Sequence, residues 1–266
     1  MPTIRKPERP EPPERPEDSE RSFRIGTAGW SIPRAAASVF PGDGSHLARY
    51  AARLPAAEIN SSFHRPHAPT TYAKWAAATP DTFRFAVKMP RTITHEGKLR
   101  RARLPLATFL AESSALGQRR GPLLVQLPPS FQFDRRVVGR FFDLLRELYD
   151  GDVVCEPRHP TWFDGRADRL LSTCRVARVA ADPALAPGAE QPGGWPGLIY
   201  YRLHGSPRTY WSSYGQPFIA ALQAALEAAP AGVPAWCIFD NTASGAAIEN
   251  AWDLWTAVRN RADTEP

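Results

Sequence analysis

The chain has 266 residues, 43% of them hydrophobic, and a formal net charge of +6 at pH 7. This length suits one α/β barrel of roughly 250 residues with a sizeable core. No apolar run approaches the roughly 18 residues that a membrane-spanning helix needs, which excludes a membrane-embedded chain. The positive charge permits nucleic-acid binding without requiring it, because there is no dense Lys/Arg run and many arginines stand beside Asp or Glu on predicted helices.

Residues 1–21 are rich in proline and charge and contain almost no apolar side chains. Such a segment cannot bury enough apolar surface to offset the conformational entropy lost on ordering, so we predict a disordered tail. The segment also lacks the apolar centre of a secretory signal. We expect a single domain over residues 22–262.

From residue 23 onward, short apolar runs typical of β-strands alternate with helical patterns. Strands are predicted at 23–27, 57–60, 83–88, 123–126, 153–156, 177–181, 198–203 and 235–239. Helices are predicted at 47–54, 71–78, 106–116, 134–149, 218–228 and 246–259. The helical pattern is clearest in 134–149, where apolar residues recur at three- and four-residue spacing, and the last helix carries Trp252 and Trp255 on one stripe.

The sixth β/α unit is predicted to be irregular. The segment after strand 177–181, PALAPGAEQPGGWPG, is too rich in glycine and proline for a full helix, so we expect a loop or a short turn there. Eight strands with their crossovers and a closing helix predict a (β/α)8 TIM barrel. An open doubly wound sheet is the alternative, but Gly26-Thr27-Ala28-Gly29 is only a fragment of its phosphate-binding motif.

Polar side chains stand at the carboxyl ends of seven predicted strands. They are Glu58, Asn60, Lys88, Gln126, Glu156, Arg158, Asp182, Arg202, His204, Asp240 and Asn241. Side chains two apart on a strand share a face, as Arg202 and His204 do. By the same alternation, we expect Asn241 to point into the barrel and Asp240 away from it. Strands that emerge into solvent often end in polar residues, but seven such ends together favour a cluster at the mouth, where barrel enzymes hold their active sites.

Seven short motifs match one known family. They are IGTAGW at 25–30, EINSSF at 58–63, FAVK at 85–88 with Thr94 and His95, QLPP at 126–129, EPRH at 156–159 with Trp162, RLHG at 202–205, and NT at 241–242. Because these motifs occur in order over residues 23–258, the chain resembles the YecE-like proteins, the TIM-barrel family called domain of unknown function 72. The resemblance implies the barrel fold and no particular activity. The chain departs from the family pattern at three positions, which are His64 in place of Tyr, Pro157 in place of a larger apolar residue, and Asp240 in place of Asn.

Three cations are candidates for binding an anion. We expect Lys88, Arg158 and Arg202 to converge on the mouth, where permanent positive charges suit a phosphate, a carboxylate or a sugar acid. The predicted partner is therefore a small anionic molecule. Alternatively, Glu58 and Glu156 pair with these cations in a network that is only structural.

Histidines and carboxylates are candidate proton-transfer groups. His204 at a strand end and His95 on the loop after strand 83–88 are the natural acids or bases near neutral pH, with Glu58 or Glu156 as the carboxylate partner. We therefore predict a hydrolase, a lyase or an isomerase. Further polar and aromatic side chains are predicted to orient and enclose the ligand, and these are Asn60, Gln126, Asn241, Trp30, Phe63, His159, Trp162 and Tyr214.

Other chemistries remain open. Glu58 and Glu156 also fit the carboxylate pair of a glycosidase, although the nearby cations argue against an uncharged glycan. A divalent metal is an alternative, with carboxylates and an imidazole as ligands from the set Glu58, Glu156, Asp182 and His204. No H-x-x-x-H spacing supports a metal site, and the nearby cations would repel a divalent ion. No cofactor is predicted to be required. A serine nucleophile lacks the G-x-S-x-G motif.

The segment 205–215 is predicted to be a mobile lid, because it mixes Arg208 with Tyr210, Trp211 and Tyr214. The same mixture suits a nucleotide or a single nucleic-acid strand, so a nucleic-acid enzyme is the second hypothesis. A barrel that binds a ligand without converting it is the third.

The three cysteines, Cys155, Cys174 and Cys237, show neither C-x-x-C spacing nor an even count. We expect reduced and mostly buried thiols, which are typical of a cytoplasmic protein. The sequence predicts no oligomeric state.

Overall fold

The structure is a computed structural model that describes residues 22–262, with side chains described to residue 260. The predicted disordered tail at 1–21 lies outside the described residues. Within 22–262, none of the helices combines the length and apolar character that a membrane crossing would need.

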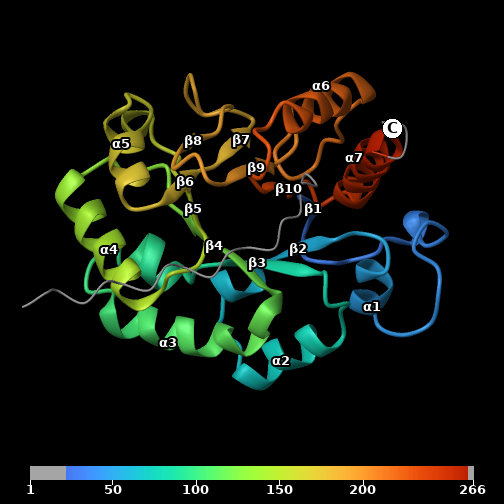
Figure 1. Cartoon of the computed structure of the whole chain (residues 1–266), viewed down its shortest axis with the longest axis horizontal. Coiled ribbons are helices and arrows are strands. Elements are labelled where there is room, and N and C mark those ends of the chain that lie inside the picture. Colours follow the sequence, from blue (N-terminus) through green and yellow to red (C-terminus); the bar gives the residue numbers. More distant parts are fainter. Residues whose placement is uncertain (1–21, 263–266) are drawn as a thin grey trace, which may run out of the picture.

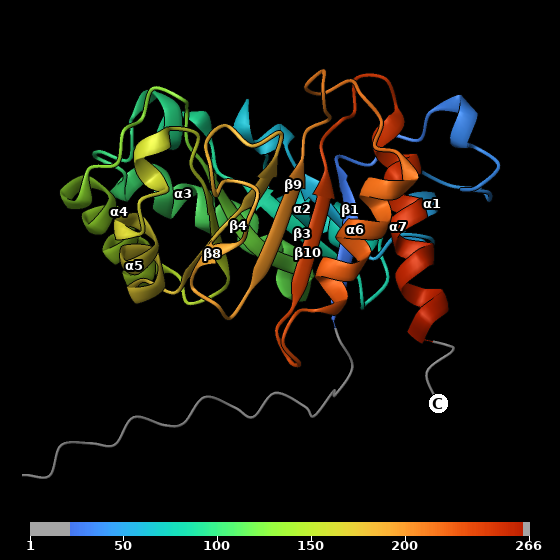
Figure 2. The same cartoon turned by 90° about the horizontal axis from the view of Figure 1, so that it is seen from above.

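The described residues form ten strands in one nearly closed, barrel-like sheet that a ring of helices surrounds (Figure 1). The strands are β1 Phe23–Ala28, β2 Ala56–Ile59, β3 Arg84–Lys88, β4 Arg120–Gln126, β5 Val153–Glu156, β6 Val176–Arg178, β7 Ala180–Asp182, β8 Gly193–Gly194, β9 Ile199–Leu203 and β10 Ala235–Phe239. Their order is β7-β9-β10-β1-β2-β3-β4-β5-β6-β8. Apart from the antiparallel pair of β6 with β8, the strand pairs of the described residues are parallel, so the carboxyl ends of these strands point the same way (Figure 2).

One residue of the chain links β6 and β7, which lie at opposite sides of the strand order. β6 pairs with β5 and β7 pairs with β9, and only Val179 separates β6 from β7. The Val179 N–H donates to the Cys155 carbonyl at 2.9 Å, which continues the pairing with β5. The predicted single strand at 177–181 is therefore divided, because the chain changes its pairing partner at Val179.

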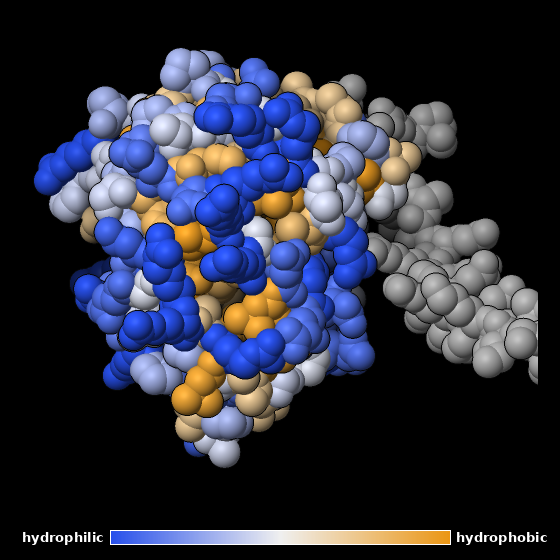
Figure 3. All heavy atoms as spheres, turned by 90° about the vertical axis from the view of Figure 1, so that its left-hand side faces the viewer, coloured by the Kyte–Doolittle hydropathy of each residue, from blue (hydrophilic) through white to orange (hydrophobic). Residues whose placement is uncertain are grey.

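The described chain has seven α-helices, of which six lie between strands and the seventh follows the last strand. They are α1 His46–Ala51, α2 Pro69–Ala77, α3 Arg103–Ser113, α4 Arg135–Leu148, α5 Arg166–Thr173, α6 Gln216–Glu227 and α7 Ala246–Ala262. Asp134 is the N-cap of α4, because its carboxylate accepts hydrogen bonds from the backbone N–H groups of Arg136 and Val137. The surface on the side of α4 and α5 is largely hydrophilic, with apolar side chains showing between charged ones (Figure 3).

The sixth unit has no α-helix, which confirms the prediction from its glycine and proline content. Between β7 and β9 the chain makes turns and the two-residue strand β8. Arg178 holds this connection, because its guanidinium donates to the carbonyls of Gly188 at 3.0 Å and Gln191 at 3.2 Å. The same guanidinium pairs with Asp168 of α5 at 2.7 Å.

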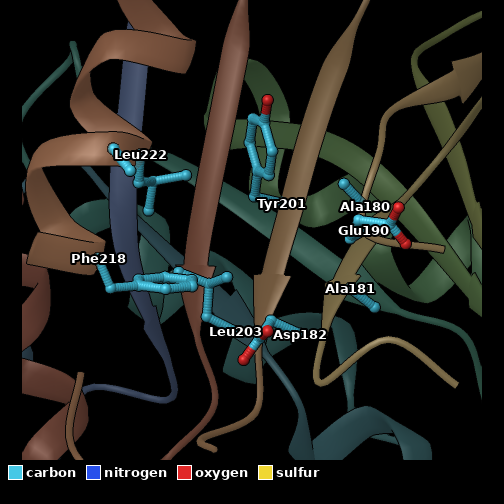
Figure 4. Close-up of a pocket in the computed structure, with 9 residues that line it drawn as sticks. Ala180, Ala181, Asp182, Glu190, Tyr201, Leu203, Phe218 and Leu222 are labelled. Carbon is cyan, nitrogen blue, oxygen red and sulfur yellow. The ribbon is translucent and has the colours of Figure 1, made fainter. Parts of the chain in front are cut away.

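The missing helix leaves a hollow on the outer face of the sheet, beside α6 (Figure 4). It has a volume of about 200 Å³ and is lined mainly by apolar side chains, among them Tyr201, Leu203, Phe218 and Leu222. Tyr201 and Leu203 alternate along β9 with Arg202, which points to the inside. The hollow is therefore separate from the polar residues at the mouth.

Two apolar layers build the core. The larger layer lies between the sheet and the helices, and the smaller one fills the inside of the sheet with residues such as Ala56, Ala86, Leu124, Val154 and Tyr200. Two positions further along each of these strands, the same face carries Glu58, Lys88, Gln126, Glu156 and Arg202. The inside of the sheet is thus apolar further from the carboxyl ends of the strands and polar or charged near those ends.

Candidate active site

Arg202 is the centre of a buried ion-pair network. Its side chain is fully buried, and it binds both oxygens of Glu58, with Nη2–Oε1 at 2.6 Å and Nε–Oε2 at 2.9 Å. Its Nη1 donates to Glu156 Oε2 at 2.9 Å, and its Nη2 also donates to Asp240 Oδ2 at 3.1 Å. Because these partners come from β2, from β5 and from the residue that follows β10, the contacts cross the inside of the sheet. We call Glu58, Glu156, Arg202, His204 and Asp240 the Arg202 cluster.

Within the Arg202 cluster, the charged forms of Glu156 and Arg202 stabilise each other. Burial by itself would raise the pKa of Glu156, but Arg158, Arg202 and His204 outweigh it and hold that pKa well below its usual range. Burial opposes the charge of Arg202 in the same way, and the neighbouring carboxylates nevertheless raise the Arg202 pKa. The guanidinium donates to carboxylates from all three of its nitrogens, so it is engaged within the cluster rather than directed at the cavity. For Arg202, this is the structural network that the sequence left open as the alternative.

His204 is locked between two carboxylates. Its Nδ1 lies 3.0 Å from Asp240 Oδ2, and its Nε2 lies 2.9 Å from Glu156 Oε1 and 2.7 Å from Arg158 Nη2. The residue is only 2% exposed, and the Tyr210 ring packs against the imidazole with ring centroids 5.7 Å apart. His204 therefore lies beneath the mouth rather than on its open surface.

The expectation that Asp240 points away from the barrel is wrong. Asp240 shares its strand face with Trp236 and Ile238, which belong to the inner apolar layer. The prediction failed because it took Asn241 as the inward residue. Asn241 instead donates from Nδ2 to the Ser212 carbonyl at 2.9 Å and to Asn250 Oδ1 at 2.9 Å, which joins the segment 205–215 to α7.

Above the Arg202 cluster lies a cavity with a volume of about 560 Å³, which we call the mouth cavity. Its lining residues come from the loops and strand ends at the carboxyl side of the sheet, and they are Asn60, Phe63, His64, Lys88, Arg91, His95, Gln126, Tyr210, Asp240 and Thr242. Of the predicted site residues, Lys88, His95, Asn60, Phe63 and Gln126 thus line one cavity.

Lys88 is the unusual cation of the mouth cavity. Only 6% of the residue is exposed, and its Nζ lies 4.3 Å from the centroid of the Phe63 ring. Among the residues that the structure describes, this ammonium has no ion pair and no hydrogen-bond partner. Burial and the charge of Arg202 lower the Lys88 pKa to about 8, even though Glu58, Glu156 and Asp240 act in the opposite direction.

His95 lies on a π-helical turn, Thr92–Glu96, that follows β3. Its Nδ1 is 2.9 Å from Thr94 Oγ1, and its ring packs edge-on against Phe63 with centroids 4.8 Å apart. Burial, helped by the positive charges of Lys88 and Arg91, lowers the His95 pKa below its usual 6.5. The imidazole is therefore neutral at pH 7 and able to exchange a proton at the cavity wall.

Two further predicted residues support Glu156. Arg158 donates to Glu156 Oε1 from Nε at 3.0 Å and from Nη2 at 2.7 Å, and Gln126 Nε2 donates to Glu156 Oε2 at 3.1 Å. Asn60 differs, because its buried Oδ1 accepts no hydrogen bond from any described residue. That oxygen is an unused acceptor beside the cavity.

Four predicted site residues lie in packing positions outside the mouth cavity. Trp30 packs edge-on against Trp75 and Phe85, and the indole N–H of the buried Trp162 donates to the Phe131 carbonyl at 3.0 Å. The other two residues are held by hydrogen bonds. His159 Nδ1 accepts from the Thr161 N–H at 3.2 Å, and the Tyr214 hydroxyl donates to Asp182 Oδ1 at 2.7 Å.

The carboxylates considered for a metal are not assembled as a ligand set. Arg202 binds both Glu58 and Glu156, and Asp182 accepts a hydrogen bond from Tyr214. Within residues 22–262, no group of three or more His, Cys, Asp or Glu side chains is arranged to hold a metal ion.

The sequence did not single out Arg91 and Thr242 as ligand-binding residues, although both line the mouth cavity. Arg91 follows the end of β3 by three residues, and Thr242 follows the end of β10 by the same number. Their distance from the strand ends is the signal that could have found them, because loops after barrel strands also line the mouth.

A model of the family described as "Protein of unknown function DUF72" matches residues 24–266. The chain belongs to the DUF72 family. This confirms the resemblance seen in the sequence motifs. Among curated proteins, the UPF0759 protein YecE of Escherichia coli, from strain K12 and from O157:H7, is 31% identical over 128 residues. That match covers 47% of this chain and 46% of YecE, so the chain spans about half the length of the curated relatives it matches.

DUF72 proteins of known structure share the fold of this chain. A DUF72 family protein from Enterococcus faecalis V583 superposes with a TM-score of 0.75 at 21% identity, covering 89% of this chain and 95% of that one. A DUF72 family protein from Thermotoga maritima MSB8 gives a TM-score of 0.73 at 22% identity, covering 90% of this chain and 100% of that one. At this identity the likeness shows a common α/β fold with a barrel-like sheet.

Proposed function

We propose that the mouth cavity is the active site of an acid–base enzyme, a hydrolase, lyase or isomerase, that acts on a small anionic substrate. The observation that supports this most is Lys88, a buried ammonium that faces a cavity and forms no ion pair or hydrogen bond with the described residues. A buried charge without a partner is costly, and such groups in a cleft mark functional sites. An anionic substrate would supply the missing partner.

The lining suggests a division of roles. Lys88 binds the negative group of the substrate, and His95 takes or gives a proton in its neutral form. Asn60 and Gln126 orient the substrate by their amides. The Arg202 cluster keeps the floor rigid, since a fully hydrogen-bonded ionic network fixes the positions of its members.

The burial of the two glutamates disfavours a glycosidase. Glu58 and Glu156 are both fully buried, and Arg202 binds each of them. A glycosidase needs two carboxyl groups that flank the scissile bond and reach the sugar. Here the carboxylates would first have to leave Arg202.

We also propose that the sheet is a (β/α)8 TIM barrel in which β6 and β7 together form the sixth strand. The one-residue link at Val179 and the pairings of β6 with β5 and β7 with β9 support it. A cytoplasmic location is proposed as well, and three unpaired, buried cysteines support a reducing compartment.

Binding of inorganic phosphate tests the proposed site. Calorimetric titration should show that Lys88→Met weakens phosphate binding about tenfold or more, which corresponds to one charge-assisted hydrogen bond of about 1.5–3 kcal/mol. Lys98→Met, which changes an exposed lysine outside the cavity lining, is the matched control. Equal phosphate affinity in wild type and Lys88→Met would contradict the assignment. A screen of phosphorylated and carboxylated compounds for turnover then separates an enzyme from a barrel that only binds.

The exposed loop after β9 favours a second candidate, an enzyme acting on single-stranded nucleic acid. Tyr210 and Trp211 are 44% and 47% exposed, and the Arg208 guanidinium lies 4.5 Å from the centroid of the Trp211 ring. Exposed aromatic rings beside arginine are typical of surfaces that stack bases. Oligonucleotide binding that weakens steeply with salt and is lost in Trp211→Ala would favour this candidate over the first.

A further inference from the structure

The mouth cavity holds a primary amine in the setting of a nucleophile. The chain has four lysines, at positions 6, 74, 88 and 98. Lys74 and Lys98 are exposed and do not line the mouth cavity, whereas Lys88 is buried at its floor. An amine reacts only as the uncharged base, so a site that uses it as a nucleophile must disfavour the ammonium by burial or by a neighbouring cation. Lys88 has both, since it is 6% exposed and the charge of Arg202 disfavours its ammonium form.

We propose that Lys88 forms a covalent imine with a small carbonyl compound that carries a carboxylate or a phosphate. This inference rests on the proposed function, and it makes that site one for carbon–carbon or proton-transfer chemistry next to a carbonyl group. An imine withdraws electrons from the adjacent carbon, which is the step that many lyases and isomerases require.

The reaction balances with groups on the cavity wall. The uncharged Lys88 amine attacks the carbonyl carbon, a C–N bond forms, and a proton moves from nitrogen to oxygen to give a carbinolamine. The C–O bond then breaks, and the oxygen leaves as water once a second proton reaches it. His95 lines the same cavity, and its neutral imidazole is suited to relay these protons. The Asn60 amide, whose Oδ1 has no described partner, is placed to accept a hydrogen bond from the carbinolamine hydroxyl or from a substrate hydroxyl.

Charge balance supports an anionic carbonyl compound over a neutral one. The cations Lys88 and Arg91 line the cavity, while Asp240 is the one carboxylate among the lining residues and is already bound to Arg202 and His204. When Lys88 reacts as the uncharged amine, Arg91 remains a cation of the cavity lining for the carboxylate or phosphate; its ion pair with Glu96, at 3.0 Å, joins two side chains that are more than half exposed and therefore holds it weakly. With the Lys88 pKa at about 8, about a quarter of the amine is uncharged at pH 7.5, against about one part in a thousand for an ordinary lysine.

The three cysteines are less suited than Lys88 to act as the nucleophile of the mouth cavity. Cys155, Cys174 and Cys237 are buried outside the cavity lining, and burial raises the pKa of each thiol. A thiol is nucleophilic as the thiolate, which these sites disfavour. Lys88 is therefore the group of the described chain that combines reactivity with access to the cavity.

Reductive trapping tests the imine directly. The full chain is incubated with pyruvate and sodium cyanoborohydride, which reduces an imine to a stable secondary amine. Intact-mass analysis should show the mass of pyruvic acid less one oxygen atom, and peptide mapping should place it on Lys88. Acetone, a carbonyl compound without a charge, should label Lys88 more slowly, and inorganic phosphate should slow the labelling by pyruvate. The labelling rate should rise through pH 8, whereas exposed lysines respond near pH 10.

The variants separate the imine from simple anion binding. Lys88→Arg keeps a positive charge but has no primary amine, so it should lose pyruvate labelling at this site and keep measurable phosphate binding. Lys98→Arg should label like wild type. If phosphate binds the wild type but pyruvate labels Lys88 no faster than Lys74 and Lys98, the imine is refuted and the anion site stands. If neither phosphate nor pyruvate binds, the proposed function itself fails.

Discussion

Replacing Arg202 by methionine is the most direct test of the buried ion-pair network. The substitution keeps much of the side-chain volume and removes the guanidinium that binds three carboxylates. Glu58 and Glu156 would then be fully buried without their main partner. Breaking a buried ion pair by removing one member destabilises a protein by about 3–5 kcal/mol, because an uncompensated charge stays in a poorly solvated place. We expect a loss of this size in the free energy of unfolding at pH 7.

The loss should depend on pH in a defined direction. The folded-state pKa of Glu156 lies well below its usual value of 4.5, because Arg158, Arg202 and His204 outweigh the effect of burial. A lowered carboxylate pKa stabilises the fold above the unfolded-state pKa, and this stabilisation disappears as the pH falls toward the folded-state pKa. The difference between wild type and Arg202→Met should therefore be full above about pH 5 and should shrink at lower pH.

Urea unfolding followed by far-UV circular dichroism measures both effects, since urea leaves the ionic strength unchanged. Arg103→Met is the matched control, because Arg103 pairs with Glu147 on the surface, where both side chains are more than half exposed. That control should unfold at nearly the wild-type urea concentration. Arg202→Met unfolding at the same urea midpoint as Arg103→Met, or a difference from wild type that grows toward acid, would refute the network as described.

Two glycine substitutions and one loop substitution make further predictions. Gly26→Ala should lower the free energy of unfolding by about 1–3 kcal/mol, because a Cβ there would overlap the Ala56 carbonyl. Gly139→Ala in α4 should raise the free energy of unfolding by about 0.5–1 kcal/mol, because its Cβ would meet only Leu170 at 3.8 Å. Thermal melting of the pair checks the opposite signs, and equal melting temperatures would count against the close approach of β1 and β2. Asn241→Ala should free the segment 205–215 by removing two hydrogen bonds, worth about 1–3 kcal/mol together. Limited proteolysis should then cut this segment faster than in wild type and in Thr242→Ala, and unchanged cleavage would contradict the anchoring role.

Where apolar patterning is strong, local sequence determined the elements. The strands at 153–156 and 235–239 agree with β5 and β10 at both ends, because continuous apolar runs in a fully buried parallel strand have clear limits. The helix predicted at 134–149 corresponds to α4 for the same reason, since its amphipathic period is regular. α5 was missed, because its eight residues include only a short apolar stretch, Leu170 and Leu171. The strand predicted at 177–181 was found but not its division, which depends on strands far away in the sequence.

For the candidate site, the sequence by itself determined which residues stand at the carboxyl ends of the strands. Only the tertiary structure decided what each of them does, because the partners come from distant parts of the chain. Glu58 and Arg202 are 144 positions apart and meet only when the sheet curves round on itself. Because of that curvature, carboxylates bind Arg202 in the interior, whereas Lys88, another cation of the predicted set, faces the cavity and forms no ion pair with the described residues. Strand alternation gives each side chain a face, but burial and pairing in three dimensions determine which charge is available to a ligand.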